Sequence, residues 1–92
     1  MIVRIASEGQ FELADEHARR LEQLDQDAIE AVRAHDNGRF TELWGQILAL
    51  VEREGRLLGP DELVPSDLIL PPRDVSLEEA EREFTQIIPE SL

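Results

Sequence analysis

Two histidines are the residues of this chain best suited to metal binding or acid–base chemistry. His17 and His35 lie eighteen positions apart in a segment whose pattern predicts a helix. At 1.5 Å per residue, roughly 27 Å of helix separates them, so a single chain cannot use both for one metal ion. His35 is expected near the carboxyl end of that helix, where a cationic ring suits the helix dipole. The histidines therefore predict no metal site.

Adjacent carboxylates are the other groups that could carry chemistry. Asp61 and Glu62 form one such pair, and Glu78 and Glu79 form another. Adjacent acids on an exposed face usually improve solubility, whereas catalysis needs a pocket that raises one pKa. No EF-hand spacing of acids is present, the glycines occur singly, and the chain contains no cysteine. We therefore expect no catalytic residue, no metal and no cofactor, and hence no enzyme.

The charge balance also limits the classes of partner. Among 92 residues, 21 Asp and Glu against nine Arg give a formal net charge of -12. This field repels nucleic-acid phosphates and anionic lipids, so we expect no nucleic-acid binding. No apolar run approaches the ~18 residues that cross a bilayer, and the first residues lack the pattern of a signal peptide. A cytoplasmic protein without direct membrane insertion is expected, in agreement with the absence of cysteine.

The elements that would position these residues begin with a β-hairpin. Ile2–Ile5 is rich in β-branched residues, and Gln10–Leu13 alternates polar with apolar side chains. Between them, Gly9 can take the positive φ that hairpin turns often require.

Two amphipathic helices follow. The first is predicted from about Asp15 to the turn at 36–38, with apolar residues at three- and four-residue steps: Ala14, Ala18, Leu21, Leu24 or Asp25, Ala28 and Val32. The second is predicted over Arg39–Glu54 and carries the single tryptophan, Trp44. The short connection requires an antiparallel helix hairpin. Trp44 is either a core anchor or, since tryptophan is enriched there, an interface hot spot.

A proline-rich stretch then returns the chain to the sheet. Pro65, Pro71 and Pro72 flank the apolar run Leu68–Leu70, and prolines cannot donate to a sheet ladder. The run is therefore predicted as a short third strand that completes a three-stranded sheet.

The residues before this strand are expected to be irregular. A loop is predicted over Arg56–Pro60. Ser66 and Asp67 are expected to bond nearby backbone groups and fix a turn before the strand.

The last predicted element is a helix that begins at a capping box, Ser76 to Glu79. Its apolar stripe comprises Leu77, Ala80, Phe84 and Ile87 or Ile88, and Pro89 ends it. The chain is thus expected to form a small single α+β domain over residues 1–92, with element order ββααβα.

Three stretches of the chain resemble the PspA-associated PspAA family of the phage-shock envelope-stress system: "MIVRIASEGQFEL", "LWGQILALVEREG" and "DELVPSDLILPPRDVSLEE". Together they cover nearly the whole chain. The resemblance implies a small cytoplasmic stress-response protein that associates with a PspA-type partner, a coiled-coil protein that protects stressed membranes. It implies no enzyme activity, cofactor or catalytic residue. The tail after "SLEE" is too generic to align.

The resulting hypothesis is a non-enzymatic adaptor or modulator that binds a PspA-like helix hairpin through the third helix or an exposed sheet edge. The candidate contacts are Leu77, Phe84, Ile87 and Ile88, although packing in the core explains each of them equally well. The alternative is a self-assembling structural homodimer without PspA contact. A metal-dependent hydrolase and an acidic mimic of nucleic acid are two further hypotheses.

Overall fold

The amino-terminal hairpin forms as its residue pattern predicts. In this computed structural model, which describes residues 1–62 and 64–87, β1 (Ile2–Ile5) pairs antiparallel with β2 (Gly9–Glu12). Gly9 lies directly opposite Ile5 and has a φ of 117°, and Ser7 in the turn has a φ of 72°. The positive φ expected for Gly9 is therefore present, because the turn needs left-handed backbone.

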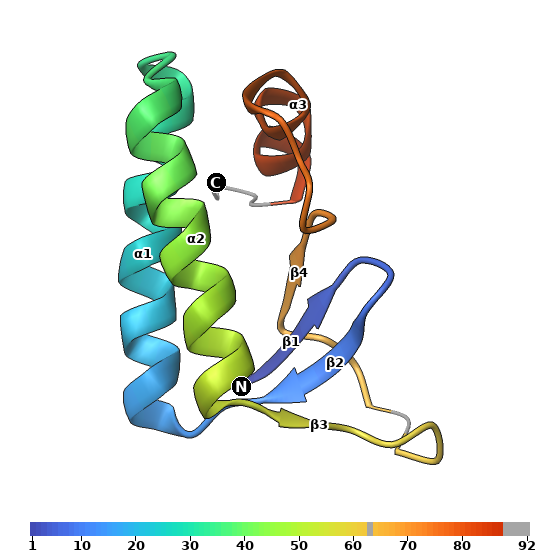
Figure 1. Cartoon of the computed structure of the whole chain (residues 1–92). Coiled ribbons are helices and arrows are strands. Elements are labelled where there is room, and N and C mark those ends of the chain that lie inside the picture. Colours follow the sequence, from blue (N-terminus) through green and yellow to red (C-terminus); the bar gives the residue numbers. More distant parts are fainter. Residues whose placement is uncertain (63, 88–92) are drawn as a thin grey trace.

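Two long helices form the antiparallel hairpin expected from the apolar periodicity. They are α1 (Asp15–Arg33) and α2 (Asn37–Glu54), which stand side by side next to the sheet (Figure 1). The chain leaves α1 before the expected turn at 36–38, since α1 ends at Arg33 and His35 adopts the left-handed conformation, with a φ of 56°. Asp36 then caps α2, since its Oδ1 accepts a 3.1 Å hydrogen bond from the backbone N–H of Arg39.

The sheet has one more strand than expected. Besides β4 (Leu68–Leu70), the two residues Arg56–Leu57 form β3, so part of the predicted loop is a strand. The described strands lie in the order β3-β2-β1-β4, with β4 parallel to β1 and β3 antiparallel to β2. A two-residue strand carries no periodicity of its own, and it forms here because α2 ends beside the free edge of β2 (Figure 1).

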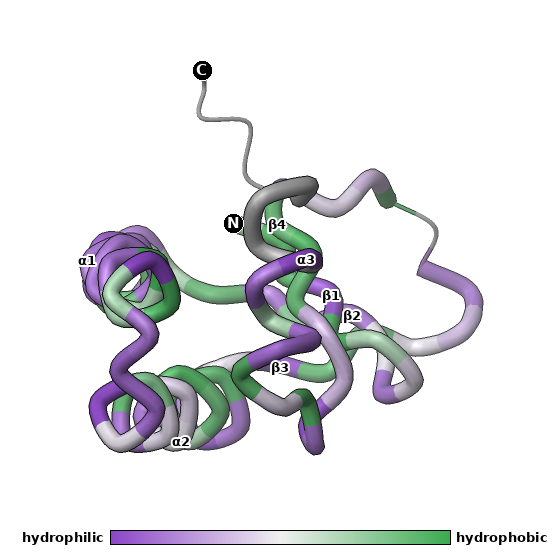
Figure 2. Tube along the Cα trace, turned by 90° about the horizontal axis from the view of Figure 1, so that it is seen from above, coloured by the Kyte–Doolittle hydropathy of each residue, from purple (hydrophilic) through white to green (hydrophobic). Residues whose placement is uncertain are grey.

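The core lies between the helix hairpin and one face of the sheet. Figure 2 shows that apolar residues recur along α1 and α2 on the sides of these helices that face the interior. The largest fully buried side chains are Phe40, Ile5, Leu13, Leu21, Ile47, Leu70, Val3, Val51 and Pro71. Trp44 is also in this core, 5 % exposed, with its ring stacked on that of Phe40 at a centroid distance of 6.4 Å.

The third helix, α3 (Leu77–Ile87), lies beside the upper half of the hairpin (Figure 1). Its capping box forms as predicted: the Ser76 N–H donates to Glu79 Oε1 at 2.9 Å, and the Glu79 N–H donates to Ser76 Oγ at 3.2 Å. A contact between His35 Nδ1 and Glu81 Oε2, 2.5 Å apart, joins α3 to the tip of the hairpin. The predicted α+β class is confirmed, with element order ββααββα.

Candidate interaction surface

The proline-rich stretch holds the sheet together through contacts that are distant in the sequence. Asp67 Oδ2 accepts a 2.8 Å hydrogen bond from the Ile2 N–H, and the Asp67 N–H donates to the Ile2 carbonyl at 2.7 Å. Ser66 Oγ accepts a 2.8 Å hydrogen bond from Gln10 Nε2. The expectation that Ser66 and Asp67 bond nearby backbone was thus wrong. Folding places β1 and β2 beside them, and those strands offer the donors.

One edge of the sheet is β4, flanked by Pro65 on one side and by Pro71 and Pro72 on the other. Within it, Ile69 is 46 % exposed although it is a large apolar residue. An outer strand of this kind leaves one row of backbone hydrogen-bonding groups without a sheet partner. The prolines limit this open row to about three residues, because they interrupt the donors on both sides.

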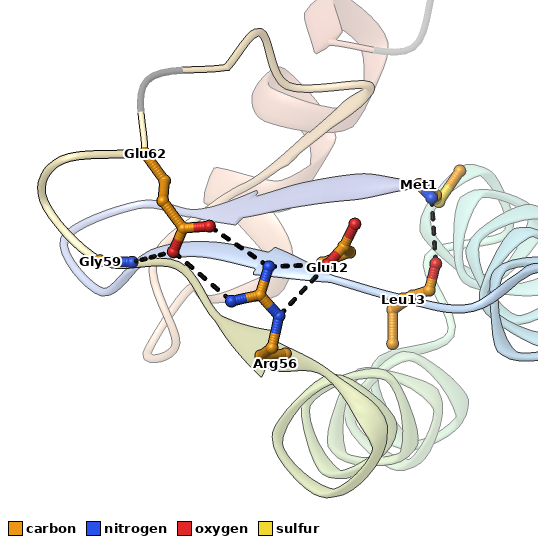
Figure 3. Close-up of polar contacts among 6 residues, drawn as sticks. All are labelled: Met1, Glu12, Leu13, Arg56, Gly59 and Glu62. Carbon is orange, nitrogen blue, oxygen red and sulfur yellow. Dashed lines mark hydrogen bonds and ion pairs between the residues drawn. The ribbon is translucent and has the colours of Figure 1, made fainter.

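The opposite edge is β3, where Leu57 is 58 % exposed. Its neighbour Arg56 bridges two acids, as Figure 3 shows: Nη2 lies 2.9 Å from Glu12 Oε1 and 3.3 Å from Glu62 Oε2. Glu62 also accepts a hydrogen bond from the Gly59 N–H at 2.9 Å. This backbone bond and the Arg56 guanidinium lower the pKa of the Glu62 carboxyl.

The first residue of the chain is fastened to the start of the helix hairpin. The amino group of Met1 donates a 3.0 Å hydrogen bond to the Leu13 carbonyl (Figure 3), and the Leu13 N–H donates to the Met1 carbonyl at 2.9 Å. Because only Ala14 separates Leu13 from α1, this pair of hydrogen bonds ties the start of the helix hairpin to the start of β1.

A second arginine clamps the connection between β4 and α3. Arg73 donates to both oxygens of Glu8, at 2.9 and 2.8 Å, and forms an ion pair with Glu52 on α2. The bidentate hydrogen bond from Arg73 lowers the pKa of the Glu8 carboxyl. The Trp44 indole N–H donates to the Arg73 carbonyl at 2.9 Å, so the tryptophan anchors the same connection.

The predicted contacts on the third helix are only partly described. Leu77 begins α3 and is half-buried against the core, so part of its side chain stays accessible. Phe84 and Ile87 fall within the helical backbone of α3, but their side chains lie outside the described part of the structure. Ile88 lies outside the described residues altogether. The third helix thus stays a prediction as a contact surface.

Asp25 was not predicted from the sequence as a functional residue. It is the one charged residue among those described that is buried, with 7 % of its surface exposed. Its Oδ1 is sealed from solvent and has no hydrogen-bond partner in the described part of the chain. Burial, together with the neighbouring Glu22 carboxylate, raises the pKa of the Asp25 carboxyl to about 6. Its sequence signal was the position itself, an acid inside an apolar stripe.

The described residues hold no cluster of three or more His, Cys, Asp or Glu that could bind a metal ion. His17 pairs instead with Glu54, with Nε2 3.4 Å from Oε1. In the same described ranges, none of the helices is both long and apolar enough to span a bilayer. The features that the described surface offers are sheet edges and exposed apolar residues, which suit contact with another polypeptide.

The comparison with family models matches residues 1–90 to the model described as PspAA, PspA-Associated protein. The search among curated proteins and the search among solved structures found no match. The match covers nearly the whole chain, including both sheet edges and every helix described above.

Proposed function

Because the chain belongs to the PspA-associated protein family, we propose that it is a non-enzymatic adaptor or modulator that binds a PspA-type protein in the cytoplasm. The observation that carries this proposal is the extent of the family match, residues 1–90. On this proposal the small α+β domain acts as a whole by protein–protein contact and takes part in the envelope-stress response.

The charge of the chain supports a basic protein surface as the target. A net charge of -12 disfavours direct contact with anionic lipids or nucleic acid, but it attracts segments rich in lysine and arginine. Such complementarity mainly increases the association rate and the specificity, whereas buried apolar contacts supply most of the affinity. Exposed Leu57, Val64 and Ile69 are described apolar residues that a partner could cover.

The test is size-exclusion chromatography with light scattering of this protein mixed with the PspA-type protein of the same organism. It is run at low and at high salt, with each protein alone as the control. A co-eluting complex with a defined mass supports the adaptor function. If the two proteins elute separately under both conditions, at concentrations of tens of micromolar, the proposal is wrong.

A homodimer formed through a sheet edge is the second candidate function. The exposed Ile69 on the outer strand β4 favours it, since edge strands of two copies can pair. The variant Ile69→Asp places a charge on that edge and should convert a dimer to a monomer. A mass of one chain for the wild-type protein alone would exclude this candidate.

The third-helix candidates Leu77, Phe84, Ile87 and Ile88 can be tested in the same assay. If α3 contacts the partner, Phe84→Ala and Ile87→Asp should each reduce the co-eluting complex while the circular dichroism of the free protein is unchanged. Normal complex formation by both variants would remove this helix from the contact surface.

A further inference from the structure

A cavity at one corner of the sheet is a feature that the proposed function does not explain. It is open to solvent, has a volume of about 250 Å³ and lies between the β1–β2 hairpin and the loop that follows β3. Its lining residues come from both sides: Arg4, Gly9, Gln10, Leu58, Gly59, Pro60 and Glu62. Pockets for drug-sized ligands are larger, roughly 300–1,000 Å³, so this cavity suits a small chemical group.

Arg4 reaches the cavity from the face of the sheet that is turned away from the core. Its neighbours in β1, Val3 and Ile5, are fully buried, and side chains alternate between the two faces of a strand. Arg4 therefore points to the opposite face, where it is exposed. None of the described side chains forms an ion pair or a hydrogen bond with the Arg4 guanidinium. Its five N–H donors are thus available to a ligand.

The other charge that lines the cavity is already compensated. Glu62 accepts a 2.9 Å hydrogen bond from the Gly59 N–H and two longer ones from the Arg56 guanidinium, as Figure 3 shows. These contacts lower the pKa of the Glu62 carboxyl, so at neutral pH it stays ionised and paired. Of the two charged side chains lining the cavity in the described structure, only Arg4 lacks a counter-charge.

Hydrogen bonds hold both walls of the cavity in place without a ligand. The Leu58 N–H donates to the Gln10 carbonyl at 2.9 Å, which joins the loop to β2. The Gln10 side chain is fixed in turn, since its Nε2 donates to the Val64 carbonyl and to Ser66 Oγ, both at 2.8 Å. A site that is formed in advance loses less conformational entropy on binding than one that must first become ordered.

We propose that this cavity binds a carboxylate on a short apolar stem, with the Arg4 guanidinium as its counter-charge. Arginine presents a planar fork of donors that matches the two oxygens of a carboxylate. Leu58 and Pro60 supply an apolar wall for the stem. The net charge of -12 opposes every anion, but it opposes a phosphate dianion about twice as strongly as a carboxylate. The site therefore favours a carboxylate over a phosphate.

Two sources can supply this chemistry: a small organic acid, or a glutamate or aspartate side chain of another protein. The site belongs to the free domain, so the inference goes beyond the proposed function and does not depend on it. A test without any PspA-type protein therefore leaves the adaptor proposal untouched, whatever its result.

The experiment is an NMR titration of the full chain, labelled with ¹⁵N, at pH 7 and constant ionic strength. Each probe is compared with an uncharged analogue of the same shape: butyrate with butyramide, and N-acetylglutamate N-methylamide with its glutamine counterpart. Inorganic phosphate is the competing anion. We expect saturable shifts of the Arg4 Nε–H and Gly59 N–H signals, with at least about fivefold tighter binding of each carboxylate than of its amide.

Variants of the full chain assign the binding to the guanidinium. Arg4→Gln removes the charge and should weaken butyrate binding by at least about fivefold, whereas Arg4→Lys keeps the charge, loses the fork and should lie between the two. The matched control is Arg39→Gln, which removes an exposed arginine of α2 that does not line the cavity and should leave binding unchanged. Unchanged amide signals away from the cavity establish that each variant is folded.

The outcomes decide both the site and the source of the ligand. Equal binding of carboxylates and amides, or butyrate binding by Arg4→Gln as tight as that of the wild-type protein, would overturn the inference. Tighter binding of phosphate than of butyrate would overturn the assigned chemical class. Much tighter binding of the blocked glutamate than of butyrate would support a protein side chain as the source, and similar binding of the two would support a small acid.

Discussion

At the scale of the single residue, the burial of Asp25 makes the stability of the fold depend on pH. Its carboxyl has a pKa of about 6 in the folded chain against 3.8 as the ordinary value. Because the folded state holds this proton more tightly, it contributes stability that is fully present below pH 4 and is lost as the pH rises through 6. A difference of about two pKa units corresponds to roughly 2–3 kcal/mol.

We expect Asp25→Asn to be more stable than the wild-type protein at pH 8, with the difference vanishing near pH 4. The amide is neutral at every pH, so it avoids burial of an ionised group whose Oδ1 has no hydrogen-bond partner among the described residues. Urea unfolding at several pH values measures this difference. Acids with lowered pKa values, such as Glu8, are common to both proteins, so they cancel in the comparison. A variant that is less stable than the wild-type protein at pH 8 would contradict this account of Asp25.

Asp67 joins the two halves of the chain through its side chain. It accepts a 2.8 Å hydrogen bond from the Ile2 N–H at the start of β1. We expect Asp67→Ala to lower the free energy of unfolding by about 1 kcal/mol, because that N–H loses its acceptor. Asp67→Asn keeps an acceptor oxygen and should lose less than half as much in the same denaturation experiment. Equal losses would mean that the charge, rather than the hydrogen bond, is what stabilises the sheet.

At the scale of the element, two glycines have opposite expected effects. Gly45 lies on an exposed turn of α2, and a Cβ built there meets nothing within 4 Å. Gly9 has a φ of 117°, and a Cβ there would approach Leu57 Cδ1 to 3.4 Å. Gly45→Ala should therefore stabilise the protein by about 0.5–1 kcal/mol, through helix propensity.

Gly9→Ala should instead destabilise it by about 1–2 kcal/mol, through backbone strain at a position that requires left-handed geometry. Thermal unfolding followed by circular dichroism compares the two variants. A melting temperature that changes in the same direction for both would contradict the assigned turn.

The helices and β3 show where prediction of secondary structure from local sequence pattern succeeds and where it fails. The long amphipathic helices were predicted because nearly twenty residues repeat one period, which leaves little ambiguity. The two residues of β3 have no such repeat. They become a strand only because Phe11 and Glu12 lie opposite them in the folded sheet.

At the scale of the whole molecule, the net charge of -12 governs how the domain meets its partner. We expect the rate of association with a basic partner to fall by about tenfold between low and high salt, while the dissociation rate changes much less. Surface plasmon resonance at three salt concentrations measures both rates. Rates that do not depend on salt would mean that apolar contacts alone drive the encounter.

The sequence by itself determined the features that depend on near neighbours along the chain. These are the hairpin turn at Gly9, the helix pair, the capping box from Ser76 to Glu79, the proline-delimited strand and the α+β class. Each follows from periodicity or from the conformational limits of one residue type. The family resemblance likewise rests on stretches of consecutive residues, and the match over residues 1–90 agrees with it.

Only the tertiary structure decided which distant groups meet. The parallel placement of β4 against β1, the bond from Ile2 to Asp67 and the clamp of Arg73 on Glu8 all join residues more than sixty positions apart. Such contacts depend on how the helix hairpin packs, which no local pattern encodes. The same packing buries Asp25 with no hydrogen-bond partner for its Oδ1 among the described residues, because burial depends on what the rest of the chain covers.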